Sequence, residues 1–306
     1  MIVKRIKTGF KKRCVFGFTL IVFCFACCGF VIASDYSEVG SRWYSFVNLF
    51  LPKVYDYGKE LDGGRIIKSK RIRISPHNVG ASYSLTFPED ITCNSLKSIR
   101  FEFRYEDTHA KGKSPMQRVR SEISGVSAKT LMSEWTIEYD LYVPFETLDD
   151  NMFKEIVTQI HENSSNPISP SFSLSVKGGF LTCSIKGDSI PISKWKNLNK
   201  PTHSHIRQLI YLEKNRWYHV KAFVGEGYRY DMNPLTRVWV DGKLLFESYQ
   251  PNCYNYIAVN KESYNYLKFG IYKPGWEILN KKGNMNLNNN RIYYFDNFIV
   301  KLKRRV

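Results

Sequence analysis

The sequence predicts an all-β domain in which two antiparallel sheets pack face to face as a jelly roll. Ten or more segments after residue 64 are rich in Val, Ile, Phe, Tyr and Trp, and many alternate polar with apolar residues. The sequence contains no long amphipathic helical pattern and no internal repeat. A sandwich of this kind often has one concave sheet face, where rows of side chains suit the binding of a long polymer.

The predicted strands follow one another with turn and loop signals between them. Asp241-Gly242 indicates a hairpin, because both turn positions tolerate a positive φ. Glycines at 178–179 and 187 mark two further turns. The predicted strands are 65–74, 82–87, 98–105, 135–143, 155–161, 172–176, 180–185, 217–224, 237–246, 266–272 and 291–302. The loops that we expect to wall a groove are 108–116, 163–171, 194–208 and 280–290.

The first 33 residues have the pattern of an export signal. Six basic residues and no acidic ones lie before residue 14, and an uncharged apolar run follows to Ala33. Small residues before Ser34 favour a cleaved signal peptide, whereas a run of about 20 apolar residues is also long enough for a membrane anchor. Either way we expect export to the periplasm or the extracellular space. The chain thus divides into 1–33, a signal peptide or anchor, 34–64, a linker or N-terminal extension, and 65–306, the β domain.

The net charge of the chain is +17, and removal of the six basic leader residues leaves about +11 (17 minus 6). Such a charge attracts polyanions, which include nucleic acid, anionic lipid and acidic polysaccharide. Export argues against nucleic acid. Four of the seven cysteines lie in the leader, and the other three (Cys93, Cys183, Cys253) are too few for a disulfide framework or a zinc site. We expect them to be small buried hydrophobic residues, with at most one disulfide.

Three short motifs carry groups that suit chemistry on a polymer. Arg118-Val119-Arg120-Ser121-Glu122 places Arg120 and Glu122 on one strand face. Gln159-Ile160-His161 places an amide beside an imidazole in the same way. In the third motif, 266–272, Tyr266, Lys268, Gly270 and Tyr272 share a face, and Gly270 leaves room for a ligand or a neighbouring side chain. One curved sheet can bring these motifs together.

Arg-Ser-Glu, Gln-Ile-His and Tyr-x-Lys-x-Gly-x-Tyr, in this order along a β-rich chain, resemble the motifs of the jelly-roll polysaccharide lyases, whose sandwich is of the concanavalin type. Jelly-roll alginate lyases carry nearly the same three motifs. The flanking sequence is more similar to the heparin lyase I and glucuronan lyase group, through 217–220, the 238–243 hairpin and 294–298. Lys273-Pro274 departs from the Asn-Gln that usually follows in the alginate enzymes. The resemblance covers residues 65–302.

The resemblance implies β-elimination from a uronic-acid polymer, which needs the substrate carboxylate neutralised while the proton leaves C5. Gln159 and Arg120 would donate hydrogen bonds to that carboxylate. His161 would be the base or a second stabilising group, since imidazole titrates near neutrality. Tyr272 would deliver a proton to the departing O4, and would also remove the C5 proton when both lie on one face of the sugar. The expected substrate-binding residues are Lys268, Arg118 and Tyr266.

Each assignment has a simpler alternative. Arg120 and Glu122 can form an ordinary ion pair, and Tyr272 can be an aromatic residue packed beneath a loop. A non-catalytic jelly roll that binds anionic glycans would keep the basic groove, but it would not require His161 and Tyr272 together. A glycoside hydrolase on this fold needs two opposed carboxylates, and the sequence offers no evident pair.

No cofactor is expected. His203 and His205 alternate as a metal pair would, but a third ligand is missing and a polar loop is the favoured interpretation. A structural calcium ion has possible oxygen ligands but no calcium-loop spacing. Those possible ligands are Asp140, Asp231, Asp241 and Asp296. The predicted partner is an anionic polysaccharide and not nucleic acid. We also expect a monomer, with possible attachment to a membrane through residues 14–33.

Overall fold

The computed structural model describes residues 53–56, 75–114, 117–195, 201–257, 264–276 with Ile278, and 290–305. The signal or anchor predicted for 1–33, the strand predicted for 65–74 and nearly all of the loop predicted for 280–290 lie outside the described residues. The chain divides into two units, 1–49 and 50–306, and the described residues all belong to the second.

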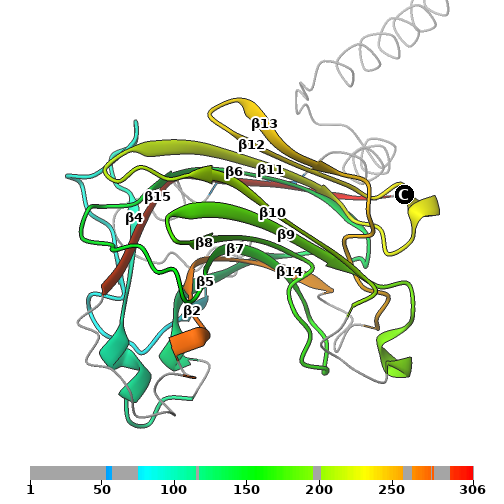
Figure 1. Cartoon of the computed structure of the whole chain (residues 1–306), viewed down its shortest axis with the longest axis horizontal. Coiled ribbons are helices and arrows are strands. Elements are labelled where there is room, and N and C mark those ends of the chain that lie inside the picture. Colours follow the sequence, from blue (N-terminus) through cyan, green and yellow to red (C-terminus); the bar gives the residue numbers. More distant parts are fainter. Residues whose placement is uncertain are drawn as a thin grey trace, which may run out of the picture. The chain divides into compact units, whose positions relative to one another are not determined.

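The domain is built from two antiparallel sheets, as the alternating pattern predicts (Figure 1). Eight strands form the first sheet. Seven follow the order β13-β12-β11-β6-β15-β4-β3, and β1 pairs with residues 299–302 of β15. The bounds of its strands are β1 Lys53–Asp56, β3 Leu85–Thr86, β4 Ile99–Arg104, β6 Ser133–Tyr142, β11 Trp217–Gly225, β12 Leu235–Val240, β13 Lys243–Ser248 and β15 Asn290–Arg304. The predicted hairpin is confirmed: Asp241 and Gly242 both have positive φ between β12 and β13.

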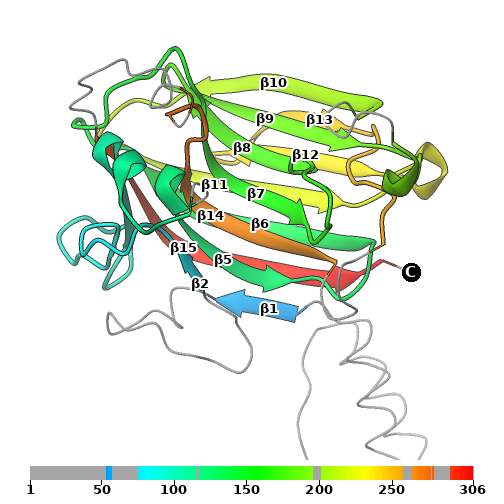
Figure 2. The same ribbon diagram turned by 90° about the horizontal axis from the view of Figure 1, so that it is seen from below.

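Seven strands form the second sheet, in the order β10-β9-β8-β7-β14-β5-β2. Their bounds are β2 Ser75–His77, β5 Arg120–Ser127, β7 Glu155–Glu162, β8 Phe172–Lys177, β9 Phe180–Gly187, β10 His203–Tyr211 and β14 Asn265–Tyr272. Four short 3-10 turns complete the described structure: η1 Tyr105–His109, η2 Gln117–Val119, η3 Ile192–Lys194 and η4 Tyr230–Met232. The two sheets curve in the same sense, and the seven-stranded sheet lies on the inner, concave side (Figures 1 and 2).

The core lies between the two sheets and is made by every second residue of their strands. Leu267, Phe269 and Ile271 of β14 are fully buried in it, as are Trp135 and Ile137 of β6. Phe269 stacks on Phe298 of the opposite sheet with ring centroids 3.9 Å apart. This inward set fixes the register, because a slip of one residue would turn it toward solvent. The outward set of the inner sheet is therefore presented on the concave face.

Two carboxyl groups are also buried near one end of the sandwich. Glu226 accepts hydrogen bonds from Trp135 Nε1 (2.8 Å), Asn265 Nδ2 (2.6 Å) and the Ser133 N–H (2.9 Å). Burial raises the pKa of Glu226 to about 8. Burial, with the neighbouring Glu226, also raises the pKa of Glu162 to about 8. Both groups are therefore largely protonated at neutral pH.

Two of the predicted segments have a different structure from the one expected. Residues 203–208, predicted to be part of a polar loop, belong to the edge strand β10. His205 packs against Phe246 at 5.0 Å, so tertiary packing draws this polar segment into the sheet. The predicted strand 82–87 shrinks to Leu85–Thr86, because Ser84 N–H bonds back to Ala81 O in a turn.

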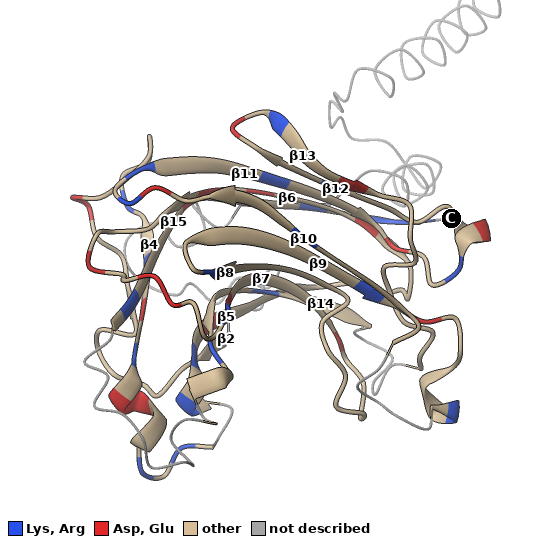
Figure 3. Ribbon diagram, in the orientation of Figure 1, with Lys and Arg blue, Asp and Glu red and all other residues tan. Residues whose placement is uncertain are grey.

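The structure also bears on the expectations about cysteines, metal ions and membrane segments. Cys183 and Cys253 are buried free thiols and Cys93 is a half-buried one. Within the described ranges, no group of three or more His, Cys, Asp or Glu side chains is arranged to hold a metal ion. In the same ranges no helix has the length and apolar character to span a membrane. Lys and Arg are interspersed with Asp and Glu over the eight-stranded sheet (Figure 3).

Candidate active site

Three neighbouring strands of the inner sheet bring the sequence motifs together. β14 lies between β7 and β5 and pairs with both (Figure 2). On the β7 side, His161 is opposite Tyr266 and Gln159 is opposite Lys268. On the β5 side, Glu122 is opposite Gly270 and Arg120 is opposite Tyr272. Since the alternate residues of β14 enter the core, Tyr266, Lys268 and Tyr272 point to the concave face.

The floor of the site is a buried layer of three polar side chains. Arg120, Glu122 and Gln159 are only 2%, 1% and 1% exposed. Arg120 Nη1 lies 3.1 Å from Glu122 Oε2, and Gln159 Nε2 donates to Glu122 Oε1 at 2.6 Å. The expected ion pair of Arg120 and Glu122 is thus present, and Glu122 orients both neighbours. Gln159 Oε1 is buried with no hydrogen-bond partner, an arrangement that a bound donor can satisfy.

Aromatic and basic side chains lie over this floor. The Arg120 guanidinium carbon is 4.2 Å from the centroid of the Tyr272 ring. Lys268 Nζ is 5.1 Å from the centroid of the Tyr266 ring, which in turn stacks on His161 at 5.7 Å. Tyr272, Tyr266 and His161 are half-buried, so a polymer on the concave face can reach them, whereas Lys268 is buried.

The surroundings of the site lower the pKa values of His161 and Lys268. Burial and the positive charges of Lys268 and Arg120 together lower the pKa of His161 to about 4. Burial also lowers the pKa of Lys268 to about 8, which Glu122 opposes and Arg120 assists. His161 Nδ1 lies 2.9 Å from Glu162 O, a contact that fixes the ring. A neutral His161 can accept a proton at neutral pH.

Gly270 allows the close approach of β5 to β14. Its φ is +128°, and a Cβ there would lie 2.4 Å from Ser121 O and 2.8 Å from Glu122 Cα. The pairing of β14 with β7 also shifts register between Phe269 and Tyr272. The sequence suggested room for a ligand or a side chain, but the space is taken up by the backbone of the strand that carries Arg120 and Glu122. Gly270 therefore sets the floor of the site and does not open it.

One predicted residue lies apart from this group. Arg118 belongs to the turn η2, before β5 begins, so the alternation that would place it beside Arg120 does not apply. Its Nε donates to Lys113 O at 3.0 Å and anchors the loop before the strand. The structure thus brings six of the seven predicted site residues to one face and places Arg118 at its border.

His77 is a site residue that sequence reasoning missed. It ends the three-residue strand β2 and pairs with Glu122 in the sheet. Burial and the positive charges of Lys268 and Arg120 lower the pKa of His77 to about 4. A second neutral imidazole therefore flanks the same charged floor from the side of β2. In the sequence, only its residue type marks His77 as a candidate, because a three-residue strand is too short to show an alternating pattern.

A second missed group holds the chain directly after Tyr272. Lys273 is fully buried, and its Nζ contacts Glu155 Oε1 (2.8 Å), Asp150 Oδ2 (2.7 Å) and Phe153 O (3.2 Å). Its N–H donates to Val119 O at 2.9 Å, one residue before Arg120. Lys273, which departs from the alginate lyase pattern, thus fixes the ends of β14, β7 and β5 where Tyr272 and Arg120 lie.

Comparison with known proteins agrees with this geometry. A family model described as "Polysaccharide lyase" matches residues 64–299. The structure is similar to endo-β-1,4-glucuronan lyase from the fungus Trichoderma reesei, with 13% identity and a TM-score of 0.56, over 83% of this chain and 95% of that one. It is also similar to alginate lyase A1-II′, a member of polysaccharide lyase family 7, with 12% identity and a TM-score of 0.50, over 82% and 100% of the two chains. No curated protein matches the sequence.

Proposed function

The chain belongs to the polysaccharide lyase family, and from this premise we propose that it cleaves a uronic-acid polymer by β-elimination at the concave face. The family implies an anionic polysaccharide as substrate, and the basic balance of the chain suits one. The observation that carries the proposal is the convergence of His161, Lys268 and Tyr272 over the buried layer of Arg120, Glu122 and Gln159.

In the proposed reaction the C5 proton moves to a base, a double bond forms between C4 and C5, and the C4–O4 bond breaks. O4 leaves with a proton supplied by an acid on the protein. The product is a 4,5-unsaturated uronate and a new end on the departing chain. No water is consumed, which separates this reaction from hydrolysis.

Neutralising the substrate carboxylate is the first requirement, because it makes the C5 proton more acidic. Gln159 Nε2 has two hydrogens and Glu122 takes one of them, so the second is available to a carboxylate oxygen. Lys268, which is cationic below its pKa of about 8, adds positive charge beside it. Arg120 lies deeper, paired with Glu122 and packed on Tyr272, so its role is to stabilise developing negative charge and to hold that ring.

Proton transfer is assigned to His161 and Tyr272. A neutral His161 takes the C5 proton when that proton lies on its side of the sugar. Tyr272 donates a proton to O4, and it takes the C5 proton when both groups lie on one face of the ring. His77 lies on the other flank of the charged floor and is assigned to contact with the sugar. Tyr266, stacked on His161, and Arg118 at the border are assigned to substrate binding.

We also propose that the protein is exported and that it acts as a monomer. The basic and apolar pattern of residues 1–33 supports export, by a cleaved signal or a membrane anchor at residues 14–33, to the compartment where such polymers occur. We assign no cofactor, since a base, an acid and a carboxylate-binding group suffice for the steps above. One complete site within one domain supports action as a monomer.

The test is the ultraviolet absorbance of the conjugated product on glucuronan, alginate and heparin, with the wild type, His161→Ala and Tyr272→Phe. We expect activity on at least one polymer and its loss in both variants, each with an unchanged circular dichroism spectrum. Glucuronan is the first choice because the glucuronan lyase has the higher TM-score of the two similar structures. Binding of a polymer with no unsaturated product would show a carbohydrate-binding protein and overturn the proposal.

A further inference from the structure

The half of the concave face farthest from β5 is formed by β8, β9 and β10 and differs in charge from the catalytic half. β8, β9 and β10 contain no Asp or Glu, and their basic residues stand without red neighbours on these strands in Figure 3. Val176 and Leu181 pair with each other and lie in the core, so the alternate residues point to the concave side. Those residues include Ser173, Ser175 and Lys177 on β8, and Phe180, Thr182, Ser184 and Lys186 on β9.

An exposed aromatic pair lies at the end of these strands. Phe180 is opposite Tyr211 of β10, and the two side chains are 38% and 42% exposed. Their ring centroids are 5.2 Å apart in an edge-to-face arrangement. Two large aromatic side chains exposed on a sheet face leave much apolar surface in water, which favours a ligand with an apolar face of its own.

The aromatic pair is fixed before any ligand arrives. Tyr211 Oη donates to Asp149 Oδ2 at 2.9 Å, and Asp149 is itself held by Lys214 Nζ at 2.6 Å. The ring rests on Gly179, where a Cβ would lie 2.3 Å from Tyr211 Cε2. The Gly178 N–H donates to Asp150 O at 2.8 Å, which ties the same turn to the loop after β6. Rigid aromatic surface binds at a low entropic cost.

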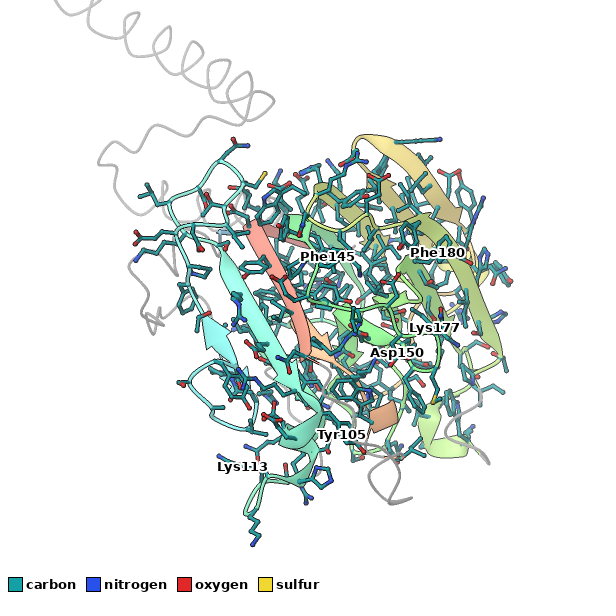
Figure 4. All side chains as sticks on the ribbon, turned by 60° about the vertical axis from the view of Figure 1, so that its left-hand side comes forward. Tyr105, Lys113, Phe145, Asp150, Lys177 and Phe180 are labelled. Carbon is teal, nitrogen blue, oxygen red and sulfur yellow. The ribbon has the colours of Figure 1, made fainter. Side chains whose placement is uncertain are left out.

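One basic side chain lies beside the pair. Lys177 is opposite Phe180 and exposed, and Figure 4 shows both on the side of the domain where Asp150 lies. Asp149, whose carboxylate accepts from Tyr211, is itself paired with Lys214 at 2.6 Å. Its negative charge is thus balanced, and Lys177 favours an anionic ligand beside the pair.

The position of this surface connects it with the active site. Across the sheet, Tyr272 is opposite Ile156, Ile156 opposite Ser175, and Ser175 opposite Thr182. Thr182 is two residues from Phe180 on β9. Three strand spacings of about 4.8 Å separate β14 from β9, or about 14 Å. A polymer that crosses the strands from Tyr272 therefore reaches the aromatic pair several sugars away.

We propose that Phe180, Tyr211 and Lys177 form a distal subsite that binds acidic sugar residues of the polymer several units from the cleaved bond. The aromatic pair packs on the apolar face of a sugar ring, and Lys177 pairs with the carboxylate of a neighbouring unit. This inference rests on the proposed function for the identity of the polymer, but its claim concerns binding and not elimination.

The test measures binding to glucuronan, alginate and heparin by calorimetry in a Tyr272→Phe background, which prevents cleavage. Phe180→Ala combined with Tyr211→Ala removes the aromatic surface, and Lys177→Ala removes the charge. Controls are Leu244→Ala and Lys243→Ala, at the exposed β12–β13 hairpin of the other sheet. The aromatic double variant should bind the polymer about tenfold more weakly, which corresponds to about 1.4 kcal/mol, and Lys177→Ala should also bind it more weakly. The controls should bind as the background does.

A disaccharide, which is too short to span both surfaces, should lose less affinity than the polymer in the same variants. Equal losses for the disaccharide and the polymer would overturn the inference, as would unchanged polymer affinity in folded subsite variants. Failure of the background protein to bind any of the three polymers would also overturn it. Polymer binding that depends on Phe180 and Lys177, with no lyase activity in the wild type, would refute the proposed function and keep the subsite.

Discussion

Replacing Glu122 with glutamine removes one negative charge from the buried floor and keeps nearly the same shape. Glu122 is 1% exposed, pairs with Arg120 at 3.1 Å and accepts from Gln159 at 2.6 Å. Breaking a buried ion pair from one side costs about 3–5 kcal/mol of unfolding free energy, because the remaining charge stays buried. Glutamine can still bond to both neighbours, so we expect a loss near the lower value, about 3 kcal/mol.

The same substitution should lower activity and shift its pH dependence. Glu122 raises the pKa of Lys268, so its loss lets burial and Arg120 lower that pKa below about 8. The alkaline limb of the rate profile should therefore move to lower pH, an effect that a purely structural role would not produce. With Arg120 and Gln159 less firmly held, we expect kcat/KM to fall about 100-fold, which corresponds to about 2.7 kcal/mol.

Glu138→Gln is the matched control, because Glu138 forms a partly exposed pair with Lys221 at 3.0 Å on the other sheet. Such a pair contributes at most about 1 kcal/mol. Denaturant unfolding gives the stability and the absorbance assay gives the rate. The reasoning is refuted if Glu122→Gln is no less stable than the control, or if its alkaline limb stays at the wild-type pH.

Three further predictions follow from the same structure. With the pKa of His161 about 4 and that of Lys268 about 8, wild-type activity should rise through an acid limb near 4 and fall through an alkaline limb near 8. A rate that is flat below about pH 6 would contradict the role of His161, and a rate that is flat from about pH 6 to about 10 would contradict that of Lys268. Gly270→Ala should reduce activity at least tenfold, because the added Cβ displaces β5, and normal activity in a folded variant would contradict the close approach. Glu162 and Glu226 hold protons in the folded state that the unfolded chain releases, so the stability that these two groups contribute is fully present below about pH 4.5 and is lost toward pH 8. Glu162→Gln should reduce that slope by about 1.4 kcal/mol per pH unit in denaturant unfolding, and an unchanged slope would contradict its buried, protonated state.

The parts of the site that sequence predicts are those on long alternating strands. In β14 every second residue is apolar, so the common face of Tyr266, Lys268 and Tyr272 follows from the chain itself. Arg118 shows where that reasoning stops, because alternation applies only after Arg120, where the strand begins. His77 depends on the pairing of β2 with β5, a contact between residues 45 positions apart that no local pattern reveals.

The fold was predictable for a related reason, and its exceptions have physical causes. The two-sheet architecture and the β12–β13 hairpin follow from alternation and turn chemistry. The edge strand β10 was not predictable, because its exposed, polar segment is ordered by pairing with β9 and by packing of His205 on Phe246. The sequence indicates that Gly270 leaves space beside the strand. Only the assembled sheet shows that the main chain of β5 fills this space.

The most direct test of the account is to follow cleavage of glucuronan, alginate and heparin in water enriched in heavy oxygen and to weigh the products. Elimination predicts an unsaturated uronate end and no heavy oxygen from solvent in either new end beyond exchange measured without enzyme. It also predicts that His161→Ala and Tyr272→Phe lose this product. Saturated ends that carry solvent oxygen would show hydrolysis, and unsaturated product that persists in both variants would place the chemistry on other residues.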